Sequence, residues 1–110
     1  MVAVQMAPID EVFRALADPT RRAVFERLAH GGEATVADLT AYAGVSQPAV
    51  SQHLKALREA GLVSERRVGR NAFYRAETRH LAPLVDWVTR QDLFWRTAFG
   101  RLSDLMKEIE

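Results

Sequence analysis

The sequence contains no cysteine and no long run of uncharged apolar residues. Without cysteine the chain cannot form a disulfide, bind a metal through thiolates or perform thiol redox chemistry. A membrane-spanning helix needs an apolar run of roughly 18 residues, so we expect no membrane partner. The first residues, MVAVQMAPIDEVF, lack the basic and apolar regions of a secretory signal. We therefore expect a cytoplasmic protein.

Catalytic and metal-binding patterns are also missing from the sequence. There is no Ser/His/Asp arrangement, no glycine-rich phosphate loop and no paired-carboxylate motif. The three histidines, His30, His53 and His80, fall in three different predicted elements. His80 and Asp86 are the best remaining pair of metal ligands, but six residues place them about 240° apart around a helix. We expect no enzymatic activity, no metal site and no cofactor.

Charge is unevenly distributed along a chain whose 110 residues suit a single domain, 1–110, and whose net charge is only +1. Residues 45–76 carry six basic and two acidic side chains, a net charge of +4. The segments before and after them have net charges of −2 and −1. Such clustering is typical of a surface that binds phosphates.

The N-terminal part of the chain has the pattern of two short helices. Apolar residues at i, i+3, i+4 and i+7 predict an amphipathic helix over 9–17. Asp18 is a suitable N-cap for a second helix, because Pro19 fits the first helical position. We expect this second helix to end at Gly31-Gly32.

Two further short helices follow, separated by a tight turn. Thr35 and Asp38 form a variant capping box that starts the first of them. Gly44 ends that helix, and Ser46 is the N-cap of the next one. This pattern predicts a helix-turn-helix over about 35–60.

The segment LVSERRV-GR-NAFYRA, about 62–76, predicts a β-hairpin that turns at Gly69-Arg70. A basic hairpin directly after a helix-turn-helix is the pattern of a winged helix. Arg70 lies at the turn and should project furthest, where an inserted arginine suits a narrow minor groove. Arg66 and Arg67 are neighbours in one strand, so their side chains point to opposite faces. We expect at most one of them to face DNA, with the other paired or solvated.

From about Thr78 a last helix is predicted to run almost to the end of the chain. Its apolar stripe is larger than a small core can cover alone. The aromatic side chains on this helix could line a dimer interface or a small-molecule pocket, and the helical spacing favours the interface. The stripe consists of Leu81, Leu84, Val88, Trp95, Phe99, Leu102, Met106 and Ile109.

The second helix of the helix-turn-helix has two distinct faces. At 100° per residue, Val50, Leu54 and Leu57 cluster on one side as a core face. His53 borders this face, so either a packed, hydrogen-bonded role or a phosphate contact remains open. The opposite side carries side chains suited to base edges and phosphates, namely Gln47, Ser51, Lys55 and Arg58, with Gln52 beside them.

Three strings carry a resemblance to a known family: FRALADPTRRAVFERL, TVADLTAYAGVSQPAVSQHLKALREAGLV and RRVGRNAFYRA. Together with the last helix they cover nearly the whole chain. The chain resembles the ArsR family of bacterial winged-helix repressors. The resemblance implies a homodimer, paired mainly through the first and last helices, on a palindromic operator. Family DNA contacts would fall on Gln47, Ser51, Gln52, Arg70 and, less firmly, His53.

The resemblance also defines where this sequence departs from the family. Metal-sensing members use cysteines near the recognition module, or His and carboxylates on the last helix. This chain resembles a cysteine-free branch without those ligands, so whether it has an effector stays open. Lys55 and Arg67 complete the predicted DNA contacts by their charge. The predicted dimer interface comprises Val12, Leu84, Val88, Trp95, Phe99, Leu102 and Met106.

The predicted fold is mainly α with a small β-hairpin: a winged helix-turn-helix with a long C-terminal dimerisation helix. The predicted function is sequence-specific binding of double-stranded operator DNA by a homodimeric repressor. One alternative is a winged helix used as a protein–protein adaptor. Polar Gln47 and Ser51 beside an arginine-tipped wing argue against that use, because an adaptor face should be more apolar. Another alternative is a regulator with a small-molecule pocket at its dimer interface.

Overall fold

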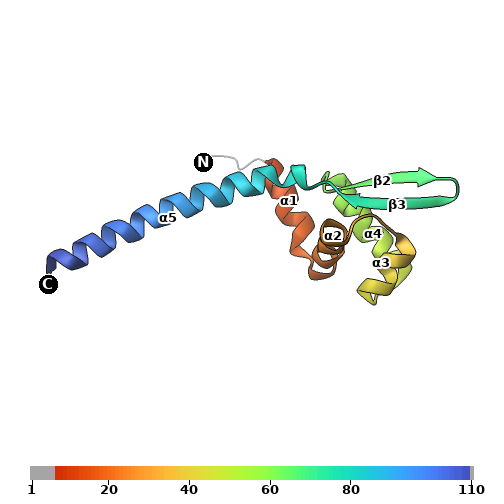
Figure 1. Ribbon diagram of the computed structural model, residues 1–110, viewed down its shortest axis with the longest axis horizontal. Helices are drawn as coiled ribbons and strands as arrows, with labels where there is room; N and C mark the ends of the chain where they lie inside the picture. Colours follow the sequence, from red (N-terminus) through yellow and green to blue (C-terminus); the bar gives the residue numbers. More distant parts are fainter. Residues whose placement is uncertain (1–6, 110) are drawn as a thin grey trace, which may run out of the picture.

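The computed structural model describes residues 7–109, an elongated molecule of 69 × 36 × 22 Å (Figure 1). Residues 1–6 and 110 of the predicted domain lie outside the described residues. We call residues 8–63 the body and the last helix the arm. The elements are α1 (Pro8–Ala17), α2 (Pro19–Gly31), β1 (Ala34–Thr35), α3 (Val36–Ala43), α4 (Gln47–Glu59), β2 (Val63–Val68), β3 (Asn71–Ala76), a 3-10 turn (Thr78–Leu81) and α5 (Ala82–Ile109).

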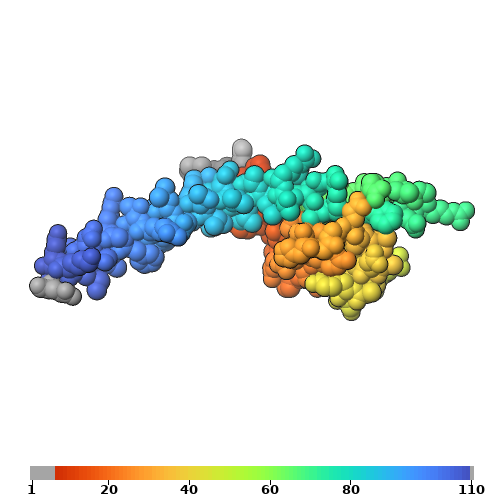
Figure 2. All heavy atoms as spheres, in the orientation of Figure 1, coloured from red at the N-terminus to blue at the C-terminus, as the bar shows by residue number. Residues whose placement is uncertain are grey.

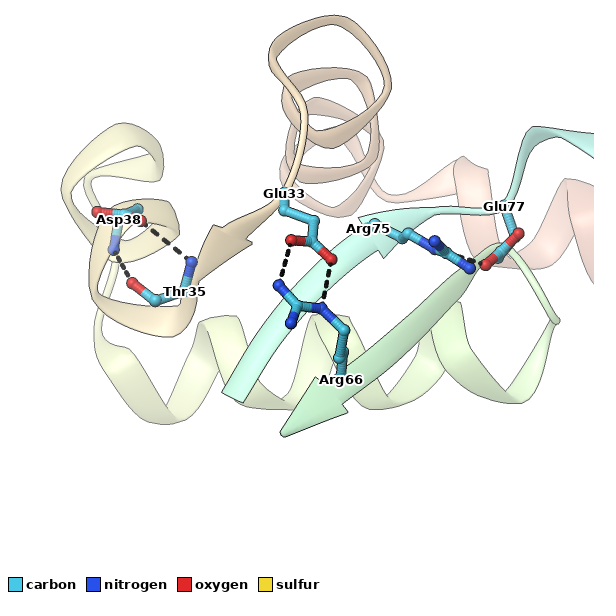
Figure 3. Close-up of polar contacts among 6 residues, drawn as sticks. All are labelled: Glu33, Thr35, Asp38, Arg66, Arg75 and Glu77. Carbon is cyan, nitrogen blue, oxygen red and sulfur yellow. Dashed lines mark hydrogen bonds and ion pairs between the residues drawn. The ribbon is translucent and has the colours of Figure 1, made fainter. Parts of the chain in front are cut away.

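The predicted helix starts are confirmed by their capping hydrogen bonds. Asp18 Oδ1 accepts the backbone N–H of Arg21 at 2.9 Å at the start of α2. Thr35 and Asp38 exchange backbone-to-side-chain hydrogen bonds of 3.1 and 3.2 Å at the start of α3 (Figure 3). Ser46 Oγ accepts an N–H at 3.3 Å at the start of α4. Each cap satisfies a backbone N–H that has no partner within its own helix.

The helix-turn-helix is confirmed. α3 ends at Gly44, whose φ of +68° is the left-handed conformation that glycine adopts without strain. Only Val45 separates this glycine from the cap of α4. The short turn leaves α4 packed against both α2 and α3.

The wing is a three-stranded antiparallel sheet in the order β1–β3–β2. Val68 pairs with Asn71, so the hairpin turns through Gly69 and Arg70 as the sequence predicts. Gly69 has a φ of +60° and Arg70 a negative one, the pattern of a type II′ turn. The sequence analysis missed β1, in which Ala34 pairs with Tyr74 on β3. A strand of two residues is too short to show a sequence period.

The core lies entirely in the body. Val50, Leu54 and Leu57 of α4 are buried, as predicted for its apolar face. Val12, which the sequence predicts as a dimer contact, is only 2% exposed, because α1 turns it into the core of its own chain. The buried apolar side chains are Val12, Ala15, Val24, Phe25, Leu28, Ala34, Leu39, Val50, Leu54, Leu57, Leu62 and Val63.

The predicted last helix starts later than expected, because its first residues form the 3-10 turn. Just before this turn, the backbone N–H of Glu77 donates to the carbonyl of Leu62 at 2.8 Å, which ties the end of the wing to the body. α5 then packs beside α1, where Phe13 and Trp87 meet edge to face with ring centroids 5.6 Å apart. Beyond this contact the arm extends away from the body (Figures 1 and 2). Within residues 7–109 no helix is both long and apolar enough to cross a bilayer.

Candidate nucleic-acid interface

The recognition helix α4 presents a polar face to solvent. Its buried side is held by the body, so its opposite side is fixed in direction. Gln47, Ser51, Gln52 and Lys55, all predicted to contact DNA, are exposed there. The structure therefore gathers amide, hydroxyl and ammonium groups on one accessible surface, a combination suited to base edges and phosphates.

His53 differs from the other predicted contacts on α4, because it is only partly exposed. Arg21 Nε, on α2, donates a hydrogen bond of 3.3 Å to His53 Nδ1. His53 thus joins α4 to α2, in agreement with the packed, hydrogen-bonded interpretation of this residue.

Arg66 and Arg67 point to opposite faces of β2, as predicted. Arg66 donates two hydrogen bonds to the Glu33 carboxylate, at 3.0 and 2.8 Å (Figure 3). The Arg66 guanidinium also lies 5.2 Å from the centre of the Phe73 ring. The Arg66 hydrogen bond lowers the pKa of Glu33, and Glu33 in turn raises the pKa of Arg66. Arg67 is 72% exposed on the other face. Arg67 therefore lies on the face of β2 opposite the Glu33–Arg66 ion pair.

A second ion pair neutralises part of the wing. Glu77 Oε1 accepts a hydrogen bond from Arg75 Nε at 3.1 Å (Figure 3). The same oxygen accepts the Ser64 hydroxyl at 2.7 Å. The Ser64 hydrogen bond, followed by that of Arg75, lowers the pKa of Glu77. Both Glu33 and Glu77 lie outside the basic segment 45–76, so its net charge of +4 falls to +2 once they are included.

Within the basic segment, Arg70 and Lys55 remain as cations without a carboxylate partner among residues 7–109. Arg70 lies at the hairpin turn, and the hairpin projects from the body as a finger (Figure 2). Lys55 lies on the exposed face of α4. The positive surface is therefore concentrated at two points, the wing tip and the middle of the recognition helix.

The sequence analysis missed one acidic residue at this surface. Glu65 of β2 accepts a hydrogen bond from Arg58 of α4, and it also lies beside Arg67. Glu65 and Arg67 are two residues apart in a strand and so share a face, which is a signal the sequence contained. The contact with Arg58 depends on the angle between α4 and the wing, which the sequence does not show.

Comparison with known proteins decides the family. Residues 18–65 match the family model described as "Bacterial regulatory protein, arsR family". The HTH-type transcriptional regulator Rv2034 of Mycobacterium tuberculosis is 45% identical over 97 residues, which cover 88% of this chain and 87% of that protein. The chain belongs to the ArsR family. It is therefore a transcriptional regulator with a DNA-binding winged helix.

Two further comparisons agree with this assignment. The transcriptional repressor SdpR of Bacillus subtilis is 34% identical over 80 residues, covering 73% of this chain and 88% of that one. The crystal structure of the ArsR family transcriptional regulator RHA00566 superposes with a TM-score of 0.73 at 30% identity, covering 86% of this chain and 97% of that one. The recognition helix lies inside the region matched by the family model, whereas the wing tip and the arm lie outside it.

The arm of this ArsR-family chain leaves its apolar side chains uncovered. Of the predicted interface residues, Val88, Trp95, Phe99, Leu102 and Met106 are exposed, Phe99 to 63%. Leu84 is only partly exposed, because it packs against the core of its own chain. Trp95 lies between Phe94 and Phe99, with ring centroids 5.1 and 5.9 Å away. A contiguous apolar surface of this kind is typical of an interface.

Metal ligands are not gathered in the same way. Within the described part of the chain, no three His, Asp or Glu side chains lie together in a group that could hold a metal ion. The predicted site residues that the structure does bring together are those on the exposed face of α4.

Proposed function

We propose that this chain is a cytoplasmic repressor that binds a palindromic operator as a homodimer. The exposed polar face of α4, inside the region matched by the ArsR family model, carries this proposal. SdpR, which is named a transcriptional repressor, supports the repressor role. The family model, the two relatives and the solved structure are all named as regulators or repressors, so the proposal includes no enzymatic step.

In this proposal Gln47, Ser51 and Gln52 read base edges from the major groove. Lys55, Arg67 and Arg70 contact phosphates and set the register. His53 is assigned to positioning α4 instead, because its Nδ1 is already bound to Arg21.

The proposed dimer forms through the arms. Val88, Trp95, Phe99, Leu102 and Met106 would pack against the second copy, with Leu84 at the edge of the contact. A two-fold dimer would place the two recognition helices about 34–36 Å apart, one turn of DNA. Burial of these side chains would remove the apolar surface that a single chain leaves in water.

Selection of bound duplexes from a random pool tests the proposal directly. The expected result is an enriched inverted repeat, with half-sites about one helical turn apart. Sedimentation of the same protein with and without the selected duplex gives the stoichiometry, expected to be two chains per duplex. Enrichment of a single unrepeated site, or of none, would contradict the proposal.

A small-molecule effector is a second candidate, supported by one observation. An open hollow of about 620 Å³ lies along the arm, lined by Arg90, Leu93, Phe94, Thr97, Ala98 and Arg101. Thermal-shift screening of the protein with small carboxylates and with apolar compounds tests it. A shift that Arg101→Ala abolishes would support an effector site, and no shift with either class would count against it.

A further inference from the structure

The carboxylate of Glu65 lies between the recognition helix and the wing. Its Oε2 accepts a hydrogen bond from Arg58 Nη1, at the last turn of α4. Its Oε1 lies 3.0 Å from Arg67 Nε, on the same strand. The Glu65 side chain is only 16% exposed, whereas those of Arg58 and Arg67 are 47% and 72% exposed. One largely buried carboxylate thus holds two arginines whose charged ends reach the surface.

The two contacts of Glu65 are unequal. Arg58 makes a hydrogen bond to Glu65 Oε2, whereas Arg67 forms an ion pair with Oε1 without a hydrogen bond. Glu65 Oε1 is buried, and none of the residues in 7–109 donates a well-formed hydrogen bond to it. Arg67 is therefore held by charge attraction alone. Separating Arg67 from Glu65 costs less free energy than separating Arg58, so another anion can bind Arg67 more easily.

Both arginines lie next to the proposed DNA contacts. At 100° per residue, Arg58 falls on the same side of α4 as Gln47 and Ser51. Arg67 is three residues before Arg70 at the wing tip. A phosphate that approaches the border between α4 and the wing would meet both guanidinium groups together with the Glu65 carboxylate.

This arrangement distinguishes Glu65 from the other acids of the wing. Glu33 holds Arg66 on the opposite face of β2, and Glu77 holds Arg75 near the base of the hairpin. Only the Glu65 pair joins α4 to the wing among the ion pairs of the described chain. The Glu65 charge consequently helps to set the angle between α4 and the wing, the two elements proposed to contact DNA.

We propose that Glu65 is a specificity-determining residue, an internal counter-ion that DNA phosphate must displace from Arg67. This inference rests on the proposed function. On random DNA the binding is almost wholly electrostatic, so competition from Glu65 lowers affinity. On the operator the same cost is offset, because Glu65 also keeps Arg58 and the wing in the orientation that the base contacts need. The Glu65 carboxylate therefore increases the difference in affinity between operator and random DNA.

Glu65→Gln tests the proposal by removing the charge and keeping the shape. Fluorescence anisotropy would compare a duplex selected from a random pool with a scrambled duplex of equal length, across a salt series. We expect affinity for the scrambled duplex to rise about three- to tenfold, with a salt slope steeper by about 0.9 for each additional phosphate bound. Affinity for the selected duplex should rise less, so that the ratio of the two affinities falls.

Glu59→Gln is the matched control, because Glu59 is an exposed acid at the end of α4, one residue after Arg58, and the charge change is identical. It should leave the affinity ratio unchanged. Equal effects of the two substitutions would mean that net charge alone matters, and this would overturn the proposal. A fall in affinity for both duplexes in Glu65→Gln would also overturn it, because Glu65 would then act only as a support.

Arg67→Ala keeps the proposal testable even if Glu65→Gln does not fold. It should weaken binding to the scrambled duplex less than Arg70→Ala does, because Arg67 gives up an internal partner on binding. Equal reductions would overturn the proposal. A wild-type protein that failed to prefer its selected duplex would instead contradict the proposed function. Preference in the wild type with an unchanged ratio in Glu65→Gln would overturn this inference alone.

Discussion

The body and the arm use their apolar side chains in opposite ways. In the body, residues such as Val24, Leu39 and Leu57 are fully buried by contacts within one chain. In the arm, no side chain among residues 82–109 is buried, and Leu93 and Ile109 are 68% and 78% exposed. The body therefore holds its fold by its own contacts, whereas the apolar side chains of the arm have no such cover within the chain. Apolar surface of this size is stabilised only when another surface covers it.

The largest expected effect comes from placing charge on the arm. Trp95→Glu with Phe99→Glu should give monomers by sedimentation, because two carboxylates cannot be desolvated at an apolar contact. Operator affinity should fall by about 100-fold or more, since the two half-sites would no longer be bound jointly. Far-UV circular dichroism should still show a folded body.

Thr97→Glu serves as the control for this experiment, because Thr97 lies on the other side of α5 from Trp95 and Phe99. It should remain dimeric. A dimer that persists in the double variant would move the interface away from the arm.

A truncation in the core should affect the body instead of the arm. Leu57→Ala removes a fully buried side chain of α4 and should lower the free energy of unfolding by about 2–5 kcal/mol. Leu105→Ala, at a 55% exposed position of the arm, should change the unfolding of the monomer much less. Urea denaturation of the two variants, at protein concentrations below the dissociation constant of the dimer, compares their free energies of unfolding. Equal reductions would mean that the arm is part of the body's cooperative unit.

A third pair of changes leaves both the core and the arm intact. Gln47→Ala with Ser51→Ala should reduce discrimination between operator and altered operator by about 1–3 kcal/mol for each base that is no longer read. Arg70→Ala should weaken binding to all sequences alike and reduce the salt slope by about 1. Anisotropy titrations at several salt concentrations separate these outcomes. A uniform weakening in the first variant would show that its side chains contact only the DNA backbone.

The smallest expected effect is on the pH dependence of the body. Hydrogen bonds from Arg66 and from Ser64 with Arg75 hold the pKa of Glu33 and of Glu77 below the ordinary value of 4.5. Carboxylates with lowered pKa stabilise the folded state above that value, and this stabilisation disappears as the pH falls through the lowered pKa. Urea unfolding at neutral and acid pH should show a smaller pH dependence in Glu33→Gln. An unchanged pH dependence would show that the Glu33–Arg66 pair does not contribute, as some exposed pairs do not.

Features with local causes were predictable from the sequence. The caps at Asp18, Thr35 and Ser46, the turn at Gly44 and the hairpin turn at Gly69 each depend on residues within a few positions. The exposed and buried faces of α4 follow from helical periodicity for the same reason. These signals placed the recognition helix and the wing correctly.

Features that join distant segments were not predictable. The Glu33–Arg66 pair spans 33 residues of sequence, and it removes charge from the wing that a count along the chain assigns to DNA binding. Val12 has the spacing of an interface residue, but packing of α1 against α2 turns it into the core. The contact of Glu65 with Arg58 likewise depends on how the wing sits against α4. Each depends on tertiary packing, for which a single sequence offers no direct signal.

The short 3-10 turn between β3 and α5 connects the wing directly to the arm. The wing strand ends at Ala76, the arm begins at Ala82, and the joint is fastened by the Glu77–Leu62 hydrogen bond and by Leu81 against the core. Because this connection is short, a rotation of the arm against a second copy would also move the wing. A change in the angle between the arms of a dimer would therefore change both the spacing of the half-sites and the depth to which each wing enters the DNA. In the proposed dimer, an insertion of one residue at this joint would change both quantities at once.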